Sequence, residues 1–231
     1  MKVFWLILCL IFIIFLRAGF AYQEYETRNI RGWKVQINHK LWSEEKVVTK
    51  RAIALLDFKL KNIENTLPKQ HHHFLKSVAI WLEKDTPGFS GMVYHPSAKW
   101  LIEHGYNPDK AKAIEITNIH NFIEWTSTQP WHVLHELAHA YHDRIISKDF
   151  PPILEAYDLA LNMGLYRQVF RNRGNKLWKA YALNSPSDYF AELTEAYFGE
   201  NDFYPFTKQE LKQYDPQGYR AIEEAWGIES S

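Results

Sequence analysis

Residues 135–139, with the sequence His-Glu-Leu-Ala-His, constrain the fold of this chain more than any other segment. Two histidines four positions apart on a helix project from the same face, about one turn from each other. Each imidazole can give one nitrogen to a zinc ion, and the adjacent Glu136 can reach a metal-bound water as a base. The segment therefore predicts a helix with a metal site, in which His135 and His139 are ligands and Glu136 is the base.

The segments around this motif predict an α+β domain. Residues 113–119 alternate apolar and polar side chains, which is typical of a half-buried strand, and the motif helix follows shortly after them. Strands are expected mainly in the first half of the chain. Helices are expected mainly in the second half, and the clearest of them cover residues 153–170 and 185–199. The sequence thus predicts a small N-terminal mixed sheet, the motif helix and a mostly helical C-terminal half.

The first 21 residues have the pattern of an export signal. Lys2 precedes an apolar run over residues 3–16, and small residues at Gly19 and Ala21 suit a signal peptidase. The run is shorter than the roughly 20 residues of a membrane span, although an uncleaved N-terminal anchor is the alternative. We expect a signal peptide over residues 1–21 and a single domain over residues 22–231. The mature protein would be secreted or periplasmic, without a stable membrane span and, since Cys9 is the only cysteine, without a disulfide.

Composition gives no support for a partner that is attracted by net charge alone. The chain has 27 basic and 27 acidic residues, so it has no global electrostatic field to attract nucleic acid or anionic lipid. Hydrophobic residues make up 46% of the chain, which is enough for one sizeable core. We therefore expect a globular domain that does not bind nucleic acid, and the sequence leaves its oligomeric state open.

A third metal ligand is expected downstream of the motif, because catalytic zinc usually has three protein ligands. The helix predicted over residues 185–199 carries Asp188, Glu192 and Glu195 on one face, at spacings of four and three. Three acids beside a packed core are costly unless cations or hydrogen bonds hold them. The carboxylates of this helix are therefore the candidates. His132 lies one turn before the motif and is expected near the metal rather than on it.

Residues 114–198 resemble the gluzincin-like branch of the zinc metallopeptidases, and most of all the group around the catalytic domain of anthrax lethal factor. The similarity rests on the motif helix and on residues 181–198, where a tyrosine precedes the sequence Asp-Tyr-Phe-Ala-Glu by seven positions. The resemblance implies a zincin-like metallopeptidase domain, bound Zn²⁺, Tyr181 as a catalytic tyrosine and Asp188 as the third ligand. It places Glu192 where the family often has a supporting carboxylate.

The chain departs from this family at Asp188, where glutamate is usual. Aspartate is shorter by one methylene, so either the helix backbone lies closer to the metal or Glu192 is the third ligand. Asp188 also follows Ser185 by three positions, which is the spacing of a capping box. Whichever carboxylate is not the ligand would orient His135 or His139.

These features together predict a secreted zinc-dependent peptidase that hydrolyses a peptide or protein substrate. Glu136 would be the general base, and Tyr181 would donate to the oxyanion unless it packs as a core aromatic. An extended substrate would pair with the strand at residues 113–119, and the aromatic-rich loop over residues 122–131 would line the groove. Two alternatives stay open: a zincin-like module that binds zinc and peptide without turnover, and a zinc hydrolase of a non-peptide amide.

Overall fold

The structure is a computed structural model that describes residues 24–228, and the predicted signal peptide lies outside these residues. Its strands are β1 (Tyr25–Ile30), β2 (Trp33–Asn38), β3 (Ile80–Leu82), β4 (Met92–Tyr94), β5 (Ile114–Ile116), β6 (Val169–Phe170) and β7 (Leu177–Trp178). Its α-helices are α1 (His39–Glu44), α2 (Lys46–Thr66), α3 (His72–Lys76), α4 (Ala98–Glu103), α5 (Ile119–Trp125), α6 (His132–Tyr141), α7 (Pro151–Met163), α8 (Pro186–Phe198), α9 (Lys208–Tyr214) and α10 (Pro216–Ala225). Shorter turns are the 3₁₀ helices η1 (Lys69–His71), η2 (Pro108–Lys110) and η4 (Tyr181–Leu183) and the π-helix η3 (His142–Ile146).

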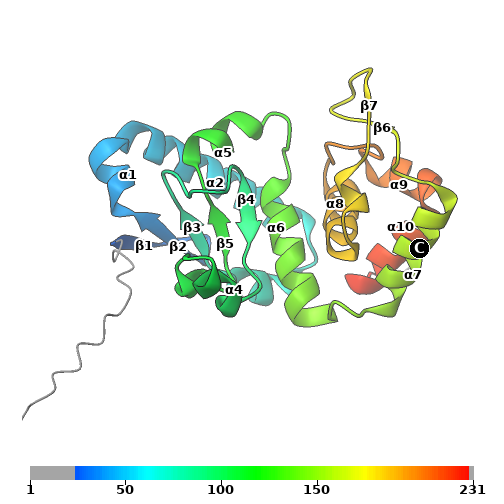
Figure 1. The fold of residues 1–231 in the computed structure, drawn as a ribbon, viewed down its shortest axis with the longest axis horizontal. Coiled ribbons are helices and arrows are strands. Elements are labelled where there is room, and N and C mark those ends of the chain that lie inside the picture. The colour runs from blue at the N-terminus through cyan, green and yellow to red at the C-terminus, as the bar shows by residue number, and fades with distance from the viewer. Residues whose placement is uncertain (1–23, 229–231) are drawn as a thin grey trace, which may run out of the picture.

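Five strands form one mixed sheet in the order β1-β2-β3-β5-β4. β2, β3 and β5 run parallel, whereas β1 and β4 are antiparallel to their neighbours. Figure 1 shows this sheet in one half of the molecule, with β4 on the side of α6, and α6 contacts β4 directly. The sheet and the helical second half confirm the predicted α+β class.

The strand predicted at residues 113–119 is an inner strand rather than an edge. It is β5, which lies between β3 and β4, and all three of its residues are buried. The polar residue of the alternation, Glu115, faces a buried polar network instead of solvent. The prediction of a half-buried strand is therefore wrong. The predicted pairing of this strand with a substrate is also wrong, because β3 and β4 already pair with its two edges. β4 is the free edge beside α6.

The second half of the chain packs its helices against α6. α8 begins after Ser185, whose hydroxyl oxygen accepts a hydrogen bond from the Asp188 amide, and it ends at Gly199, as predicted. A Cβ added to Gly199 would overlap the ring of Trp131, the residue before α6, so this glycine permits the close approach of the two helices. Buried apolar side chains from both halves form one continuous core.

The helix predicted over residues 153–170 is shorter than expected. α7 ends at Met163 because Gly164 adopts a left-handed conformation with φ of 73°, which closes the last turn. The chain then forms the antiparallel hairpin of β6 and β7, which Figure 1 shows projecting beyond α8. Among residues 24–228, no helix has the length and apolarity needed to cross a membrane.

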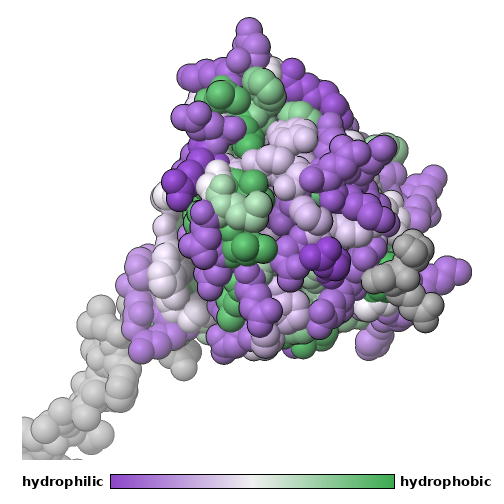
Figure 2. Space-filling model, turned by 90° about the vertical axis from the view of Figure 1, so that its right-hand side faces the viewer, coloured by the Kyte–Doolittle hydropathy of each residue, from purple (hydrophilic) through white to green (hydrophobic). Residues whose placement is uncertain are grey.

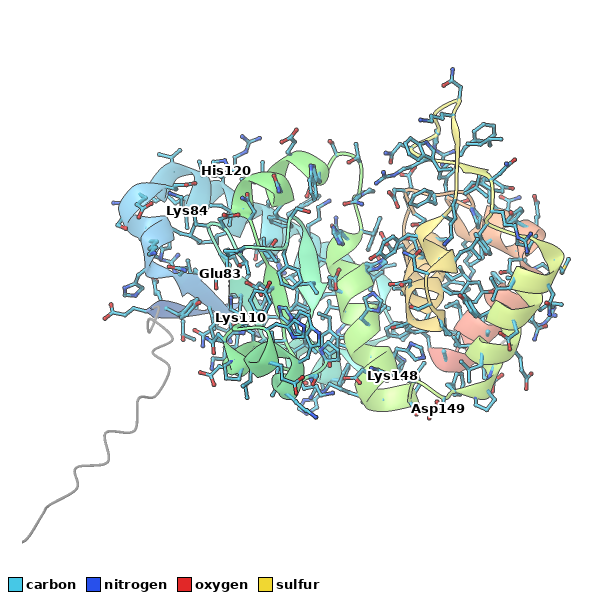
Figure 3. The ribbon with its side chains drawn as sticks, viewed as in Figure 1. Glu83, Lys84, Lys110, His120, Lys148 and Asp149 are labelled. Atoms are coloured by element: carbon cyan, nitrogen blue, oxygen red, sulfur yellow. The ribbon has the colours of Figure 1, made fainter. Side chains whose placement is uncertain are left out.

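A buried polar network fixes the sheet beside β5. Lys110 is 5% exposed, and its Nζ lies 2.6 Å from a carboxylate oxygen of both Glu83 and Glu115 (Figure 3 labels Glu83 and Lys110). His95, directly after β4, lies with Nε2 2.6 Å from the other oxygen of Glu115. The network therefore ties the inner strand β5 to the residue that follows the edge strand β4.

We expect Lys110→Met to lower the free energy of unfolding by about 3–5 kcal/mol, because Glu83 and Glu115 would keep buried charges without their shared cation. Urea denaturation at neutral pH measures this change. Lys99→Met is the control, since the Lys99 side chain is 84% exposed and, within the part of the chain that the structure describes, forms an ion pair only with Glu103, at 3.8 Å. The control should change stability by less than about 0.5 kcal/mol. Equal effects of the two substitutions would contradict a stabilising role for the network.

Candidate metal centre

The predicted motif lies on α6, between the edge strand β4 and helix α8. Apolar residues on this helix, among them Leu134, Leu137 and Ala138, are completely buried and hold its orientation. His135 and His139 turn towards α8, whereas Glu136 turns towards β4, and His135 and Glu136 are 5% and 4% exposed. The chain continues from α6 into the π-helix η3, a form that often occurs next to functional sites.

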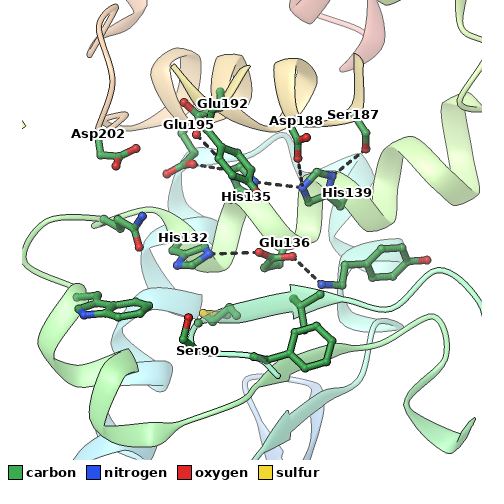
Figure 4. A pocket seen from close by; sticks show the side chains of 18 of the residues that line it. Ser90, His132, His135, Glu136, His139, Ser187, Asp188, Glu192, Glu195 and Asp202 are labelled. Atoms are coloured by element: carbon green, nitrogen blue, oxygen red, sulfur yellow. Dashed lines mark hydrogen bonds and ion pairs between the residues drawn. The ribbon is translucent and has the colours of Figure 1, made fainter. Parts of the chain in front are cut away.

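Both motif histidines are held through their Nδ1 atoms. His135 Nδ1 lies 2.7 Å from Glu195 Oε1, and His139 Nδ1 lies 2.8 Å from Ser187 Oγ (Figure 4). With Nδ1 as the donor in both rings, both Nε2 atoms carry a lone pair. These two Nε2 atoms lie 3.1 Å apart, a distance at which two lone pairs cannot satisfy each other. Burial and the neighbouring His135 lower the pKa of His139, which keeps its imidazole neutral.

Asp188 faces the same point from α8. Its Oδ1 lies 3.5 Å from His139 Nε2, and its Oδ2 accepts a hydrogen bond of 2.7 Å from the Ser185 hydroxyl. The two predicted roles of this residue, in the helix cap and in the site, are therefore compatible. The carboxylate contacts the Ser185 hydroxyl rather than the Ser185 backbone N–H expected of a capping box.

This donor set suits a divalent metal ion. One ligand atom from each of His135, His139 and Asp188 falls within 4.8 Å of the others. Ligands about 2.0–2.1 Å from a tetrahedral zinc ion lie roughly 3.3 Å from one another, close to the distances of 3.1 and 3.5 Å seen here. A cation between the two Nε2 atoms would also remove the contact between their lone pairs.

The other two carboxylates of α8 lie on the far side of His135. Glu192 Oε1 is 3.9 Å from His135 Nδ1, the ring nitrogen opposite Nε2, and Asn201 donates to its second oxygen. Burial raises the pKa of Glu192 and of Glu195 well above the ordinary value, and the nearby Asp202 raises both further. Glu192, Glu195 and His135 Nδ1 form a second group with the spacing of metal ligands, but Glu195 already accepts a hydrogen bond from that nitrogen.

Glu136 is held by two donors on the side of the site opposite α8. Its Oε2 accepts a hydrogen bond of 2.7 Å from the Tyr94 amide in β4, and its Oε1 lies 3.2 Å from His132 Nε2 (Figure 4). Burial alone would raise its pKa, but the hydrogen bond with His132 is the main interaction that lowers it, and the pKa of Glu136 falls to about 2. The carboxylate is therefore ionised and oriented by the edge strand.

Tyr181 stands at the rim of the same site. It begins the 3₁₀ helix before α8, is 50% exposed, and its ring centroid lies 6.1 Å from that of His135. The alternative, that Tyr181 packs as a core aromatic, is therefore wrong. Burial raises the pKa of Tyr181, and Asp188 and Glu136 add to the shift, so its hydroxyl keeps its proton at neutral pH.

A cavity of about 730 Å³ opens in front of these groups. It is lined by residues 88–94 of the β4 segment, by Trp125 and Gln129 of the predicted aromatic loop, and by side chains of α6 and α8. Arg171, directly after β6, and Tyr181, three residues after β7, also line it. The structure thus brings every predicted site residue to one cavity.

Sequence reasoning missed three partners of the site. They are Ser187, which contacts His139, the Tyr94 amide, which contacts Glu136, and Glu195 as the partner of His135 in place of Glu192. Two of them had a signal in the sequence: Ser187 directly precedes the predicted ligand Asp188, and Glu195 lies on the acidic face of the same predicted helix. The Tyr94 contact depends on the position of β4, which the sequence does not reveal.

The comparisons with known proteins give no guide to this site. The chain matches no protein-family model, no curated protein and no solved structure.

Proposed function

We propose that the protein is a zinc-dependent peptidase. The observation that supports this most is the convergence of His135 Nε2, His139 Nε2 and Asp188 Oδ1 on one point, with the ionised Glu136 beside it. Two imidazoles and one carboxylate form a donor set that catalytic zinc sites use, and three ligands leave a coordination position open.

When bound, zinc would supply Lewis acidity, which lowers the pKa of a coordinated water towards about 7 and polarises a peptide carbonyl. The chain supplies the proton transfers. Glu136, ionised at neutral pH, accepts a proton from the attacking water and passes it to the leaving amine. The Tyr94 amide donates a hydrogen bond to one oxygen of this carboxylate, and His132 contacts the other oxygen. The two contacts fix the orientation of the base.

Tyr181 would stabilise the negative charge that develops on the carbonyl oxygen. Its hydroxyl keeps its proton and stands at the rim of the cavity near His135. A donor positioned before the reaction can contribute about 3–4 kcal/mol to the stabilisation of such a transition state.

The edge strand β4 is suited to hold an extended peptide. The backbone groups of Gly91 and His95 bond to the β5 side of this strand, so those of Met92 and Tyr94 point the opposite way, towards the cavity. The Tyr94 amide bonds to Glu136 on that side, which agrees with this alternation. A substrate chain added beside β4 would place a peptide bond next to Glu136.

Metal removal and replacement test this function. We expect chelation to abolish cleavage of a fluorogenic peptide library and stoichiometric zinc to restore it, because the substrate carbonyl cannot be polarised without the metal. Metal analysis of the same samples reports zinc bound to each chain. Full zinc occupancy without cleavage of any peptide would instead indicate a binding module. Cleavage that survives complete removal of the metal would contradict the proposal.

A further inference from the structure

The β6–β7 hairpin carries a combination of side chains that the candidate metal centre does not use. Phe170, Leu177 and Trp178 are 45%, 48% and 44% exposed, three of the large apolar side chains that the fold leaves in solvent. All three lie within one hairpin whose strands have two residues each. Figure 2 shows hydrophobic side chains gathered below the hydrophilic tip at the top of the molecule, where Figure 1 places this hairpin.

The same segment concentrates positive charge. Five basic residues and no acidic residue occur between Asp158 and Asp188, although the whole chain is neutral: Arg167, Arg171, Arg173, Lys176 and Lys179. Arg171 and Arg173 form ion pairs with carboxylates of the body of the protein. Within residues 24–228, Arg167, Lys176 and Lys179 have no carboxylate within ion-pair distance, and all three are exposed. The Lys176 ammonium lies 4.2 Å above the Trp178 ring, so charge and aromatic surface are adjacent.

We propose that this hairpin docks the protein on the surface of an anionic lipid membrane. The register pairs Phe170 with Leu177 on one face of the ribbon and places Trp178 on the other, so both faces of a narrow projection carry an exposed apolar side chain below its polar tip. Such a projection can enter the headgroup region of a bilayer, where tryptophan is favoured and lysine can contact lipid phosphates.

A protein partner fits the hairpin less well than a bilayer does. A stable protein interface buries about 800 Å² on each side, far more than two strands of two residues can offer. A lipid surface needs no shape complementarity, and each cation near it strengthens binding about fivefold. Since Arg171 within the hairpin and Tyr181 shortly after β7 both line the cavity, docking would hold the mouth of the cavity beside the lipid.

Vesicle flotation tests this proposal without any peptidase assay. The purified mature protein is mixed with vesicles of phosphatidylglycerol and phosphatidylcholine in equal parts, or of phosphatidylcholine alone. We expect binding to the anionic vesicles that weakens as salt is raised, and no binding to the neutral ones. Absence of binding to the anionic vesicles would overturn the proposal, whether or not the protein cleaves peptides.

Paired variants separate the contributions of charge and apolar surface. Leu177→Ser with Trp178→Ser should weaken binding at least tenfold, and Lys176→Gln with Lys179→Gln should weaken it by a similar factor. Val47→Ser with Phe58→Ser is the matched control, because these side chains are 82% and 54% exposed on α2, and it should leave binding unchanged. Circular dichroism checks that each variant is folded. Binding that needs the lysines but not Leu177 and Trp178, and that soluble heparin matches, would assign the hairpin to a soluble polyanion and overturn the membrane proposal.

Discussion

Replacing Glu136 by glutamine is expected to lower kcat for peptide hydrolysis by about 10²–10⁴-fold while zinc stays bound. Glutamine has nearly the shape of glutamate, and its carbonyl oxygen can still accept from the Tyr94 amide. It cannot take a proton from water, so the variant loses the base and keeps the architecture. The measurement is steady-state cleavage of a fluorogenic peptide, with zinc content determined on the same preparation.

Glu124→Gln is the control for this substitution. It makes the same chemical change at an exposed position on α5, away from His135 and His139. It should leave kcat and KM unchanged. Unchanged turnover in Glu136→Gln would contradict the role of Glu136 as general base. It would not contradict the proposed binding of zinc by His135, His139 and Asp188.

Replacing Asp188 by asparagine is expected to weaken zinc binding by more than about 100-fold, because it removes a charged ligand that faces His139 Nε2. Asparagine can still accept from the Ser185 hydroxyl at the start of α8, so the helix cap is retained. The matched change Glu192→Gln should weaken binding by about 10-fold, the lower end of what a residue that supports a ligand contributes. Competition titration with a zinc-chelating dye measures both affinities.

The ranking of these two variants decides which carboxylate completes the site. Glu192 faces His135 Nδ1, the nitrogen that bonds to Glu195, so it lies on the wrong side of the ring for the point where the Nε2 atoms meet. A larger loss of affinity in Glu192→Gln than in Asp188→Asn would assign the third ligand to Glu192.

The sequence predicted the local elements of the site well, because each carries its own signal. The spacing of His135 and His139 predicts their shared helix face, and Ser185 and Gly199 mark the two ends of α8. The resemblance to zinc metallopeptidases predicted that Asp188 of α8 lies near the histidines of α6. In the structure Asp188 faces His139, which agrees with this expectation.

The order of strands could not be predicted, because it depends on contacts between distant segments. β4 has three residues, too few for an alternation to show, yet it is the edge that faces α6. The alternation over β5 was real but misleading, since Lys110 and His95 bury its polar side chain. The end of α7 was misjudged because Gly164 stops the helix before the apolar residues that seemed to continue it.

The two contacts that orient the motif histidines join residues far apart in the chain. His135 and Glu195 are 60 positions apart, and His139 and Ser187 are 48 positions apart. An unfolded chain keeps only the histidine pair of one segment and loses the carboxylate, so it would hold zinc far more weakly than the folded chain does. By mass action, zinc at 100 times its dissociation constant would add about 2.7 kcal/mol to the stability of the fold. The metal of the proposed site would then serve as a reversible cross-link between the two halves of a chain whose described residues contain no cysteine.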